Sequence, residues 1–296
     1  MKELQNKVKE LKLLISRSND LDEQIKLKKQ LYRTKLELLE MIHEKDKIRA
    51  GLSARELIAK VDNMPKMPKF ETGMPLVDLQ LGGGFETGLF VNLAGESGAG
   101  KTTFLLHLLS NLSEGRKTVF FNFEMGDRLF VKKLKDLKLS DNQLDNMIID
   151  SDTNKLEDLI MEIELYAEDD IKFFAIDSKM KIYTNSQAQE YQQISNMSKE
   201  LARLAARKDI VIFLINQMNE EDIKNKRLAF KGSGDQKYDS DIALFLVKED
   251  EKRKLICTKN RMNDKLFTID ISIRDYSNIP IVTEFVNDNE FIGNVI

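Results

Sequence analysis

A glycine-rich segment with a lysine and two threonines carries the clearest chemical signal in the sequence. Residues 90–94 before it form an apolar run typical of a buried strand, and residues 104–112 after it follow a helical pattern. The segment reads Gly95, Glu96, Ser97, Gly98, Ala99, Gly100, Lys101, Thr102 and Thr103. Glycines let successive backbone amides face one concavity at a helix N-terminus, where nucleotide phosphates bind. Lys101 adds positive charge for the β- and γ-phosphate oxygens, and Thr102 offers a hydroxyl to Mg²⁺. The order of strand, loop and helix argues against a chance turn and predicts a nucleotide site.

Acidic and amide side chains follow further apolar runs. The runs are residues 119–123, 172–176 and 210–215. Glu124 follows the first run, Asp177 the second, and Asn216-Gln217 the third. Because the carboxyl ends of parallel strands meet at one edge, we expect these groups beside Lys101. Asp177 is the expected second Mg²⁺ ligand, since a strand-end carboxylate without a function would be costly to bury. Glu124 is the candidate to orient or deprotonate water. Gln217 is either a γ-phosphate sensor or an ordinary strand-end amide.

The elements that must position these residues alternate between strands and helices from Phe70 onward. This alternation predicts an α/β fold with a mostly parallel central sheet in residues 70–296. Residues 51–69 are expected to be a linker with a short helix over residues 54–61, since Ser53 and Glu56 form a capping-box pattern. Residues 279–286 are interpreted as a last edge strand, with a partner-binding peptide as the alternative.

The first fifty residues are expected to form a helical hairpin or a broken long helix. They contain no glycine or proline, and Leu4, Val8, Leu11 and Ile15 form a heptad-like apolar seam. So short a seam buries little by itself, so it needs a partner surface. This coiled-coil arm either packs on the main domain or serves as a docking or oligomerisation arm for a protein partner.

Composition excludes several classes of protein. The chain has 296 residues, 46 Lys+Arg, 49 Asp+Glu and a net charge of -3, which gives no general attraction to nucleic acid. The single cysteine, Cys257, excludes a disulfide framework and a four-cysteine zinc module. Without a long apolar run or a signal-peptide pattern, we expect a cytoplasmic chain with no membrane segment.

Four segments resemble the RecA-like ATPases, and among them the replicative DNA helicases of the DnaB type. They are residues 72–103, the FNFEM segment at residues 121–125, residues 190–219, and residues 232–247 followed by Lys259-Asn260-Arg261. The resemblance implies a RecA-like P-loop NTPase core with ATP and Mg²⁺ as cofactors, and it assigns water activation to Glu124. It also implies that Lys259 and Arg261 reach the nucleotide of a neighbouring subunit, so that the chain works as a homo-oligomer, a hexameric ring. The alternative for this triplet is a solvated hairpin tip.

The same resemblance implies single-stranded DNA as a partner in DNA replication. The segments expected to face DNA are residues 179–189 and 220–232. The second has a net charge of only about +1, which is weak for a segment that follows phosphates, so a solvated surface remains the alternative.

Three functions are therefore weighed. The first is an ATP-hydrolysing helicase motor on single-stranded DNA. The second is a regulatory or loader-type ATPase of the RecA fold whose N-terminal helices dock a protein. The third, a scaffold without turnover, is disfavoured because Lys101, Thr102, Glu124 and Asp177 are all present.

Overall fold

The chain divides into two compact units, Met1–Lys66 and Met67–Ile296. The computed structural model describes residues 2–46, 51–64, 68–183, 190–218, 220–225, 227–230, 239–249 and 252–271. The edge strand predicted over residues 279–286 lies outside the described residues.

The first unit contains α1 (Lys2–Arg17), α2 (Leu21–Asp46) and α3 (Ala54–Asp62). Helices α1 and α2 pack as a hairpin, which decides between the two predicted arrangements. The break falls at Asp20, whose Oδ1 accepts the Asp22 N–H at 2.9 Å and so caps α2. Helix α3 begins with the predicted capping box: the Ser53 Oγ accepts the Glu56 N–H, and the Glu56 carboxylate accepts the Ser53 N–H.

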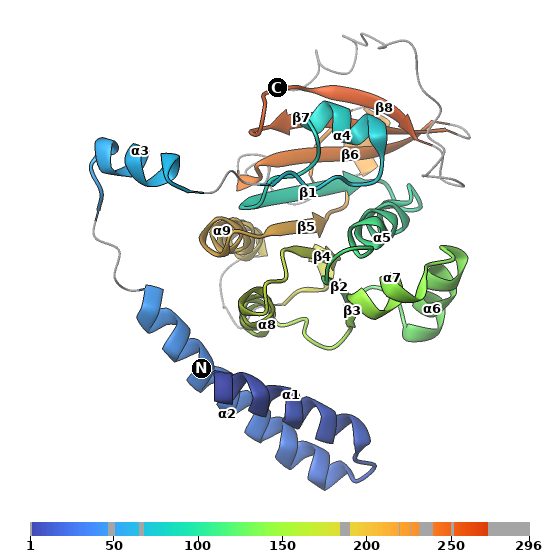
Figure 1. Ribbon diagram of the computed structural model, residues 1–296. Coiled ribbons are helices and arrows are strands. Elements are labelled where there is room, and N and C mark those ends of the chain that lie inside the picture. The colour runs from blue at the N-terminus through green and yellow to red at the C-terminus, as the bar shows by residue number, and fades with distance from the viewer. Residues whose placement is uncertain are drawn as a thin grey trace. The chain divides into compact units, whose positions relative to one another are not determined.

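An eight-stranded sheet forms the centre of the second unit (Figure 1). Its strands are β1 (Leu89–Gly95), β2 (Thr118–Asn122), β3 (Met147–Asp150), β4 (Phe173–Asp177), β5 (Val211–Ile215), β6 (Ile242–Glu249), β7 (Lys252–Asn260) and β8 (Phe267–Ile271). They lie in the order β3-β2-β4-β5-β1-β6-β7-β8. The first six strands in this order are parallel, and β7 and β8 add an antiparallel edge. The predicted, mostly parallel α/β fold is confirmed.

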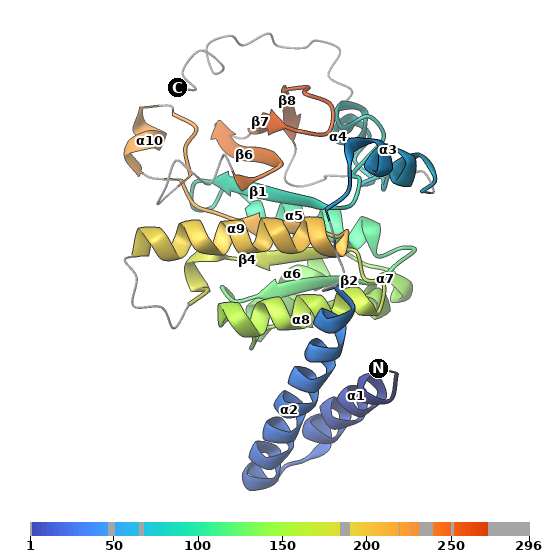
Figure 2. The same cartoon turned by 90° about the vertical axis from the view of Figure 1, so that its left-hand side faces the viewer.

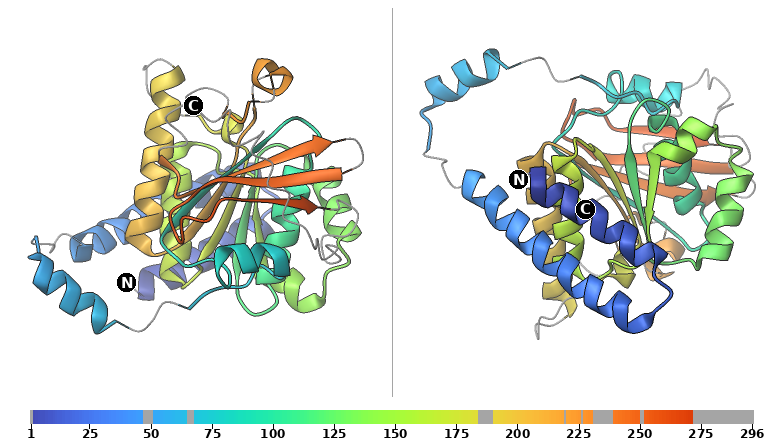
Figure 3. Two further views of the ribbon diagram at one scale, coloured as in Figure 1. Left: turned by 90° about the horizontal axis from the view of Figure 1, so that it is seen from above. Right: turned by 60° about the horizontal axis from the view of Figure 1, so that its bottom comes forward.

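Helices cover both faces of the sheet. They are α4 (Pro75–Leu81), α5 (Lys101–Leu112), α6 (Asp127–Asp136), α7 (Asp141–Asn146), α8 (Leu156–Glu168), α9 (Glu190–Lys208) and α10 (Glu220–Lys224), with a 3₁₀ turn at Lys179–Lys181. Helices α5 to α7 lie on one face, and α8 and α9 lie on the other (Figures 1 and 2). Helix α4 packs against β8 at the antiparallel edge (Figure 3).

The central strands are apolar on both faces because helices bury both. Along β4, Phe173 joins the core under α5, and its neighbour Phe174 joins the core under α8 and α9. Successive strand side chains point to opposite faces, so one continuous apolar run supplies both layers. The sequence shows the same pattern as uninterrupted hydrophobic runs. Among the described helices, none is both long and apolar enough to cross a lipid bilayer.

Candidate nucleotide site

The glycine-rich loop between β1 and α5 depends on glycine at particular positions. Gly98 and Gly100 have φ of 75° and 98°, in the left-handed region that side chains disfavour. Gly95 needs its small size for a different reason, since a Cβ there would lie 2.4 Å from the Leu246 carbonyl oxygen on β6. The loop is therefore packed directly against the β6 backbone.

Lys101, the first residue of α5, turns its amine back into the loop. Its Nζ donates to the Gly95 carbonyl at 3.0 Å and to the Glu96 carbonyl at 2.8 Å. Burial lowers the pKa of Lys101, while the charges of Glu124 and Asp177 act in the opposite direction. The amine is thus held at the loop, where a nucleotide phosphate would receive its charge.

Asp177, at the end of β4, forms the most strongly perturbed group of the site. It is fully buried, and its Oδ2 accepts the Thr102 hydroxyl at 2.6 Å. Burial, opposed by that hydrogen bond and reinforced by the nearby Glu124 carboxylate, raises its pKa to about 7. Its Oδ1 has no hydrogen-bond partner within the described part of the chain.

These features fit a Mg²⁺ ion held jointly by protein and nucleotide. The two predicted ligands, Thr102 and Asp177, already touch, and the second oxygen of Asp177 is buried without a donor among the described residues. No group of three or more His, Cys, Asp or Glu that could cage a metal occurs in the part of the chain that the structure describes. Mg²⁺ typically uses one or two protein ligands and completes its shell with phosphates and waters.

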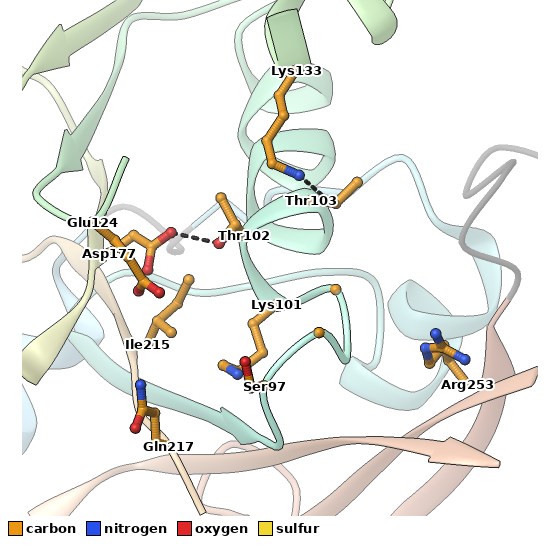
Figure 4. A pocket seen from close by; sticks show the side chains of 12 residues that line it. Ser97, Lys101, Thr102, Thr103, Glu124, Lys133, Asp177, Ile215, Gln217 and Arg253 are labelled. Atoms are coloured by element: carbon orange, nitrogen blue, oxygen red, sulfur yellow. Dashed lines mark hydrogen bonds between the residues drawn. The ribbon is translucent and has the colours of Figure 1, made fainter. Parts of the chain in front are cut away.

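Glu124 is presented by a turn after β2. The Asn122 side-chain amide donates to the Met125 carbonyl at 2.7 Å and accepts the Met125 N–H at 3.2 Å, which closes this turn. The Phe123 N–H donates to the Asp177 carbonyl at 2.7 Å, which ties the turn to the end of β4. Figure 4 shows the Glu124 carboxylate beside that of Asp177, and Glu124 is exposed to solvent.

The structure brings most of the predicted site residues to one cavity of about 340 Å³. Its lining consists of Ser97, Gly98, Gly100, Lys101, Thr102, Thr103, Glu124, Lys133, Asp177, Ile215, Gln217 and Arg253. Gly95, Glu96 and Ala99 belong to the loop without lining the cavity. The strand-end rule therefore places Glu124, Asp177 and Gln217 near Lys101, as the sequence predicts.

Three lining residues have no counterpart in the sequence-based prediction. Lys133 reaches from α6 and lies 3.5 Å from the Thr103 hydroxyl, Ile215 ends β5, and Arg253 comes from β7. Lys133 and Arg253 occur among other lysines in the sequence, where they resemble ordinary surface charges. Only their distance from Glu124 or from a strand end could have drawn attention to them.

Lys259 and Arg261 lie elsewhere. Strand β7 ends at Asn260, which pairs with Ile242 at the start of β6, and Ile242 in turn pairs with Val91 early in β1. The triplet therefore sits at the amino-terminal edge of the parallel strands, while the loop lies at the carboxyl edge. At about 3.3 Å per residue, the length of β1 separates them by about 20 Å. Neither residue lines the cavity of its own chain.

The segments expected to face DNA are only partly described. Lys179 is 3% exposed, so it cannot meet a DNA phosphate at the surface, whereas Lys181 and Tyr183 are exposed. In the second segment, α10 covers residues 220–224, and Arg227 is exposed. The remaining residues of both segments lie outside the described residues.

A known family matches the region that contains this site. Residues 74–222, half of the chain, match the family described as "AAA domain". The chain belongs to this AAA domain family. The match spans the loop, Glu124, Asp177 and Gln217, and together with the fold it identifies a P-loop ATPase of the RecA-like class, as the sequence predicts.

Solved structures support the same fold for this AAA domain chain. One whose title describes an ATPase domain aligns with a TM-score of 0.65 and 19% identity, over 77% of this chain and 98% of that one. A structure titled as a DnaB-like replicative helicase and its interactions with primase aligns with a TM-score of 0.64 and 16% identity, over 91% of this chain and 73% of that one.

Curated relatives include proteins of DNA repair and recombination. The DNA repair protein RadA of Listeria monocytogenes is 29% identical over 161 residues, which cover 52% of this chain and 33% of the relative. The DNA repair and recombination protein RadB of Methanococcoides burtonii is 28% identical over 165 residues, which cover 52% of this chain and 71% of the relative. The chain thus spans about one third of the length of the RadA proteins that it matches.

Proposed function

We propose that this chain is an ATP-hydrolysing ring motor of the DnaB-helicase type that acts on single-stranded DNA. The observation that carries the proposal is the separation of the site residues between two edges of one sheet. Lys101, Glu124 and Asp177 meet at the carboxyl edge, while Arg261 lies at the amino edge with its side chain 57% exposed. An exposed arginine that cannot reach its own nucleotide is suited to reach that of a neighbour.

Each group of the cavity has a distinct role in this proposal. The loop amides and Lys101 hold the β- and γ-phosphates, and Gln217 hydrogen-bonds near the γ-phosphate. Mg²⁺, held by Thr102 and Asp177, would neutralise charge on the phosphate oxygens. Glu124 accepts a hydrogen bond from the attacking water and orients it toward the γ-phosphorus. Arg261 of a neighbouring subunit, with Lys259 beside it, stabilises the charge that develops on the transferred group.

The DNA part of the proposal rests on the similar proteins and on the topology of the chain. The similar proteins are named for replication, repair and recombination. The 3₁₀ turn at Lys179–Lys181 and helix α10 follow β4 and β5 at the same edge as the phosphate loop. A ring would repeat the exposed cations Lys181 and Arg227 once per subunit, which strengthens a modest charge.

The experiment measures ATP hydrolysis by the full chain with and without single-stranded DNA, together with the mass of the particle by light scattering. The proposal expects a multimer whose hydrolysis rate rises at least several-fold with DNA, and which unwinds a forked duplex. A monomer whose rate ignores DNA would contradict the motor.

A second candidate is a RecA-fold ATPase that switches the assembly of a protein partner. The observation in its favour is the first unit, whose hairpin exposes Leu13, Leu14, Leu21 and Ile25 by 43% to 70%. Deleting residues 1–50 distinguishes the two functions. A motor keeps DNA-stimulated hydrolysis after the deletion, whereas a switch loses its response to the partner that binds these helices.

A further inference from the structure

Strand β7 brings a second arginine, Arg253, to the phosphate cavity from the same chain. Its residue is 8% exposed, its Nε donates to the Ala99 carbonyl in the loop at 3.2 Å, and it lines the cavity. Figure 4 shows its guanidinium on the opposite side of the loop from Glu124 and Asp177. Arg253 is therefore placed to act on the loop rather than on the metal ligands.

The hairpin of β6 and β7 supports the loop at two points. The Leu246 carbonyl on β6 lies against Gly95 at the start of the loop, and Arg253 on β7 binds Ala99 near its end. Arg253 pairs in register with Lys248 across this hairpin, so the backbone that carries it is held by the sheet. A buried guanidinium is costly unless it is hydrogen-bonded, which makes its contact with the loop carbonyl important for the site.

We propose that Arg253 is a positioning residue that fixes the curvature of the phosphate loop for binding the β-phosphate of ATP and ADP. By holding the Ala99 carbonyl on the outer side of the loop, it leaves the loop amides directed into the cavity. ADP and ATP share the β-phosphate, so the effect is the same for both nucleotides. The inference rests on the nucleotide binding that belongs to the proposed function.

The test measures the affinities of the full chain for Mg-ADP and for a non-hydrolysable ATP analogue by isothermal titration calorimetry. Arg253→Met keeps the buried stem but removes the donor, and it weakens both nucleotides by the same factor, about tenfold. Arg253→Lys restores both affinities to within about threefold, because an ammonium can also donate to the Ala99 carbonyl. Lys254→Ala is the matched control, since the neighbouring strand residue faces the other side of the sheet and leaves both affinities unchanged.

Steady-state hydrolysis gives a second readout that a general loss of structure would not produce. Arg253→Met raises the KM for ATP about tenfold and leaves kcat within about twofold, because Lys101, Glu124 and Asp177 are untouched. Thermal unfolding of the nucleotide-free variants confirms that Arg253→Met and Arg253→Lys are folded.

Three results would overturn the inference. They are unchanged affinities in Arg253→Met, a loss confined to the ATP analogue, which indicates a γ-phosphate contact instead, or a folded Arg253→Lys variant that binds as weakly as Arg253→Met. Failure of the unmodified chain to bind either nucleotide is a separate outcome, because it contradicts the proposed function itself.

Discussion

At the scale of single residues, Asp177 shows how burial prepares a site for a cation. Its carboxylate is fully buried, has one hydroxyl donor in Thr102 and lies near a second carboxylate, Glu124. Burial and the Glu124 carboxylate disfavour the negative charge more than the Thr102 hydroxyl favours it, which is why the pKa rises to about 7. A divalent ion at the buried Oδ1 would reverse this balance.

Mg²⁺ binding is therefore expected to compete with a proton on Asp177. Below about pH 7, the affinity for Mg²⁺ in the presence of ADP falls by about tenfold per pH unit, since the carboxyl must lose its proton first. Calorimetric titrations between about pH 5.5 and 8.5 measure this dependence. An affinity that does not change across this range would show that Asp177 is not the ligand.

Asp177→Asn provides the control, because it removes both the ligand and the titration. In the metal-free chain the folded pKa of about 7 exceeds the ordinary value of 3.8, so the folded state holds the proton more tightly. The contribution of Asp177 to folding stability is therefore lost as pH rises from about 4 to about 7. Asp177→Asn is expected to unfold several degrees higher than the unmodified chain at about pH 8 without metal, and at nearly the same temperature at about pH 4.

Glu124 is expected to matter for turnover rather than for binding. Glu124→Gln keeps the size and the turn closed by Asn122 but removes the charge that orients water. We expect kcat to fall by about 10²-fold or more, with the affinity for ATP kept within about threefold. Single-turnover hydrolysis and nucleotide titration separate the two quantities. Unchanged turnover would remove Glu124 from the mechanism.

At the scale of elements, the antiparallel edge is joined to the centre of the sheet through Asp241. Its carboxylate accepts the Phe90 N–H at 2.9 Å and the Arg261 guanidinium at 3.0 Å. Its backbone donates to the Phe90 carbonyl at 2.8 Å and accepts the Arg261 N–H at 3.0 Å. One residue thus connects the start of β1 to the turn that presents Arg261.

Replacing Asp241 is therefore expected to affect stability more than replacing Arg261. Asp241→Ala leaves the Phe90 N–H without its side-chain acceptor, which costs about 1–3 kcal/mol of unfolding free energy. Arg261→Ala removes an exposed ion pair and changes that free energy by less than about 1 kcal/mol. Urea denaturation measures both. An equal loss in the two variants would show that the Arg261 ion pair, rather than the Phe90 contact, stabilises this edge.

At the scale of the whole molecule, the proposed active site is complete only between two subunits. Arg261→Ala subunits keep an intact cavity, and Lys101→Ala subunits keep the arginine that a neighbour needs. Each variant alone is expected to hydrolyse ATP at least about 10²-fold more slowly than the unmodified chain. Mixing them should restore part of the activity, because some interfaces then combine an intact cavity with an intact arginine.

The mixing ratio supplies the control for this prediction. Activity should pass through a maximum at an intermediate ratio and vanish at both extremes. A mixture that stays inactive at every ratio, although light scattering shows mixed assemblies, would count against action between subunits.

Much of the site follows from the sequence because its signals are local. The loop from Gly95 to Thr103 is a contiguous strand, turn and helix start, and the Ser53–Glu56 capping box spans a single turn. Glu124, Asp177 and Gln217 each follow an apolar run, and the geometry of parallel strands brings such strand ends to one edge. Short-range hydrogen bonding and hydrophobic periodicity suffice for these features.

Other contacts join residues that no local pattern relates. Arg253 meets Ala99, Lys133 meets Thr103, and Asp241 meets both Phe90 and Arg261, across separations of 20 to 154 positions in the chain. In the sequence these charged residues resemble a solvated surface, and their partners are backbone groups or hydroxyls without a distinctive signature. Such contacts depend on which strands become neighbours and in what register, and that is a property of the whole sheet rather than of any segment.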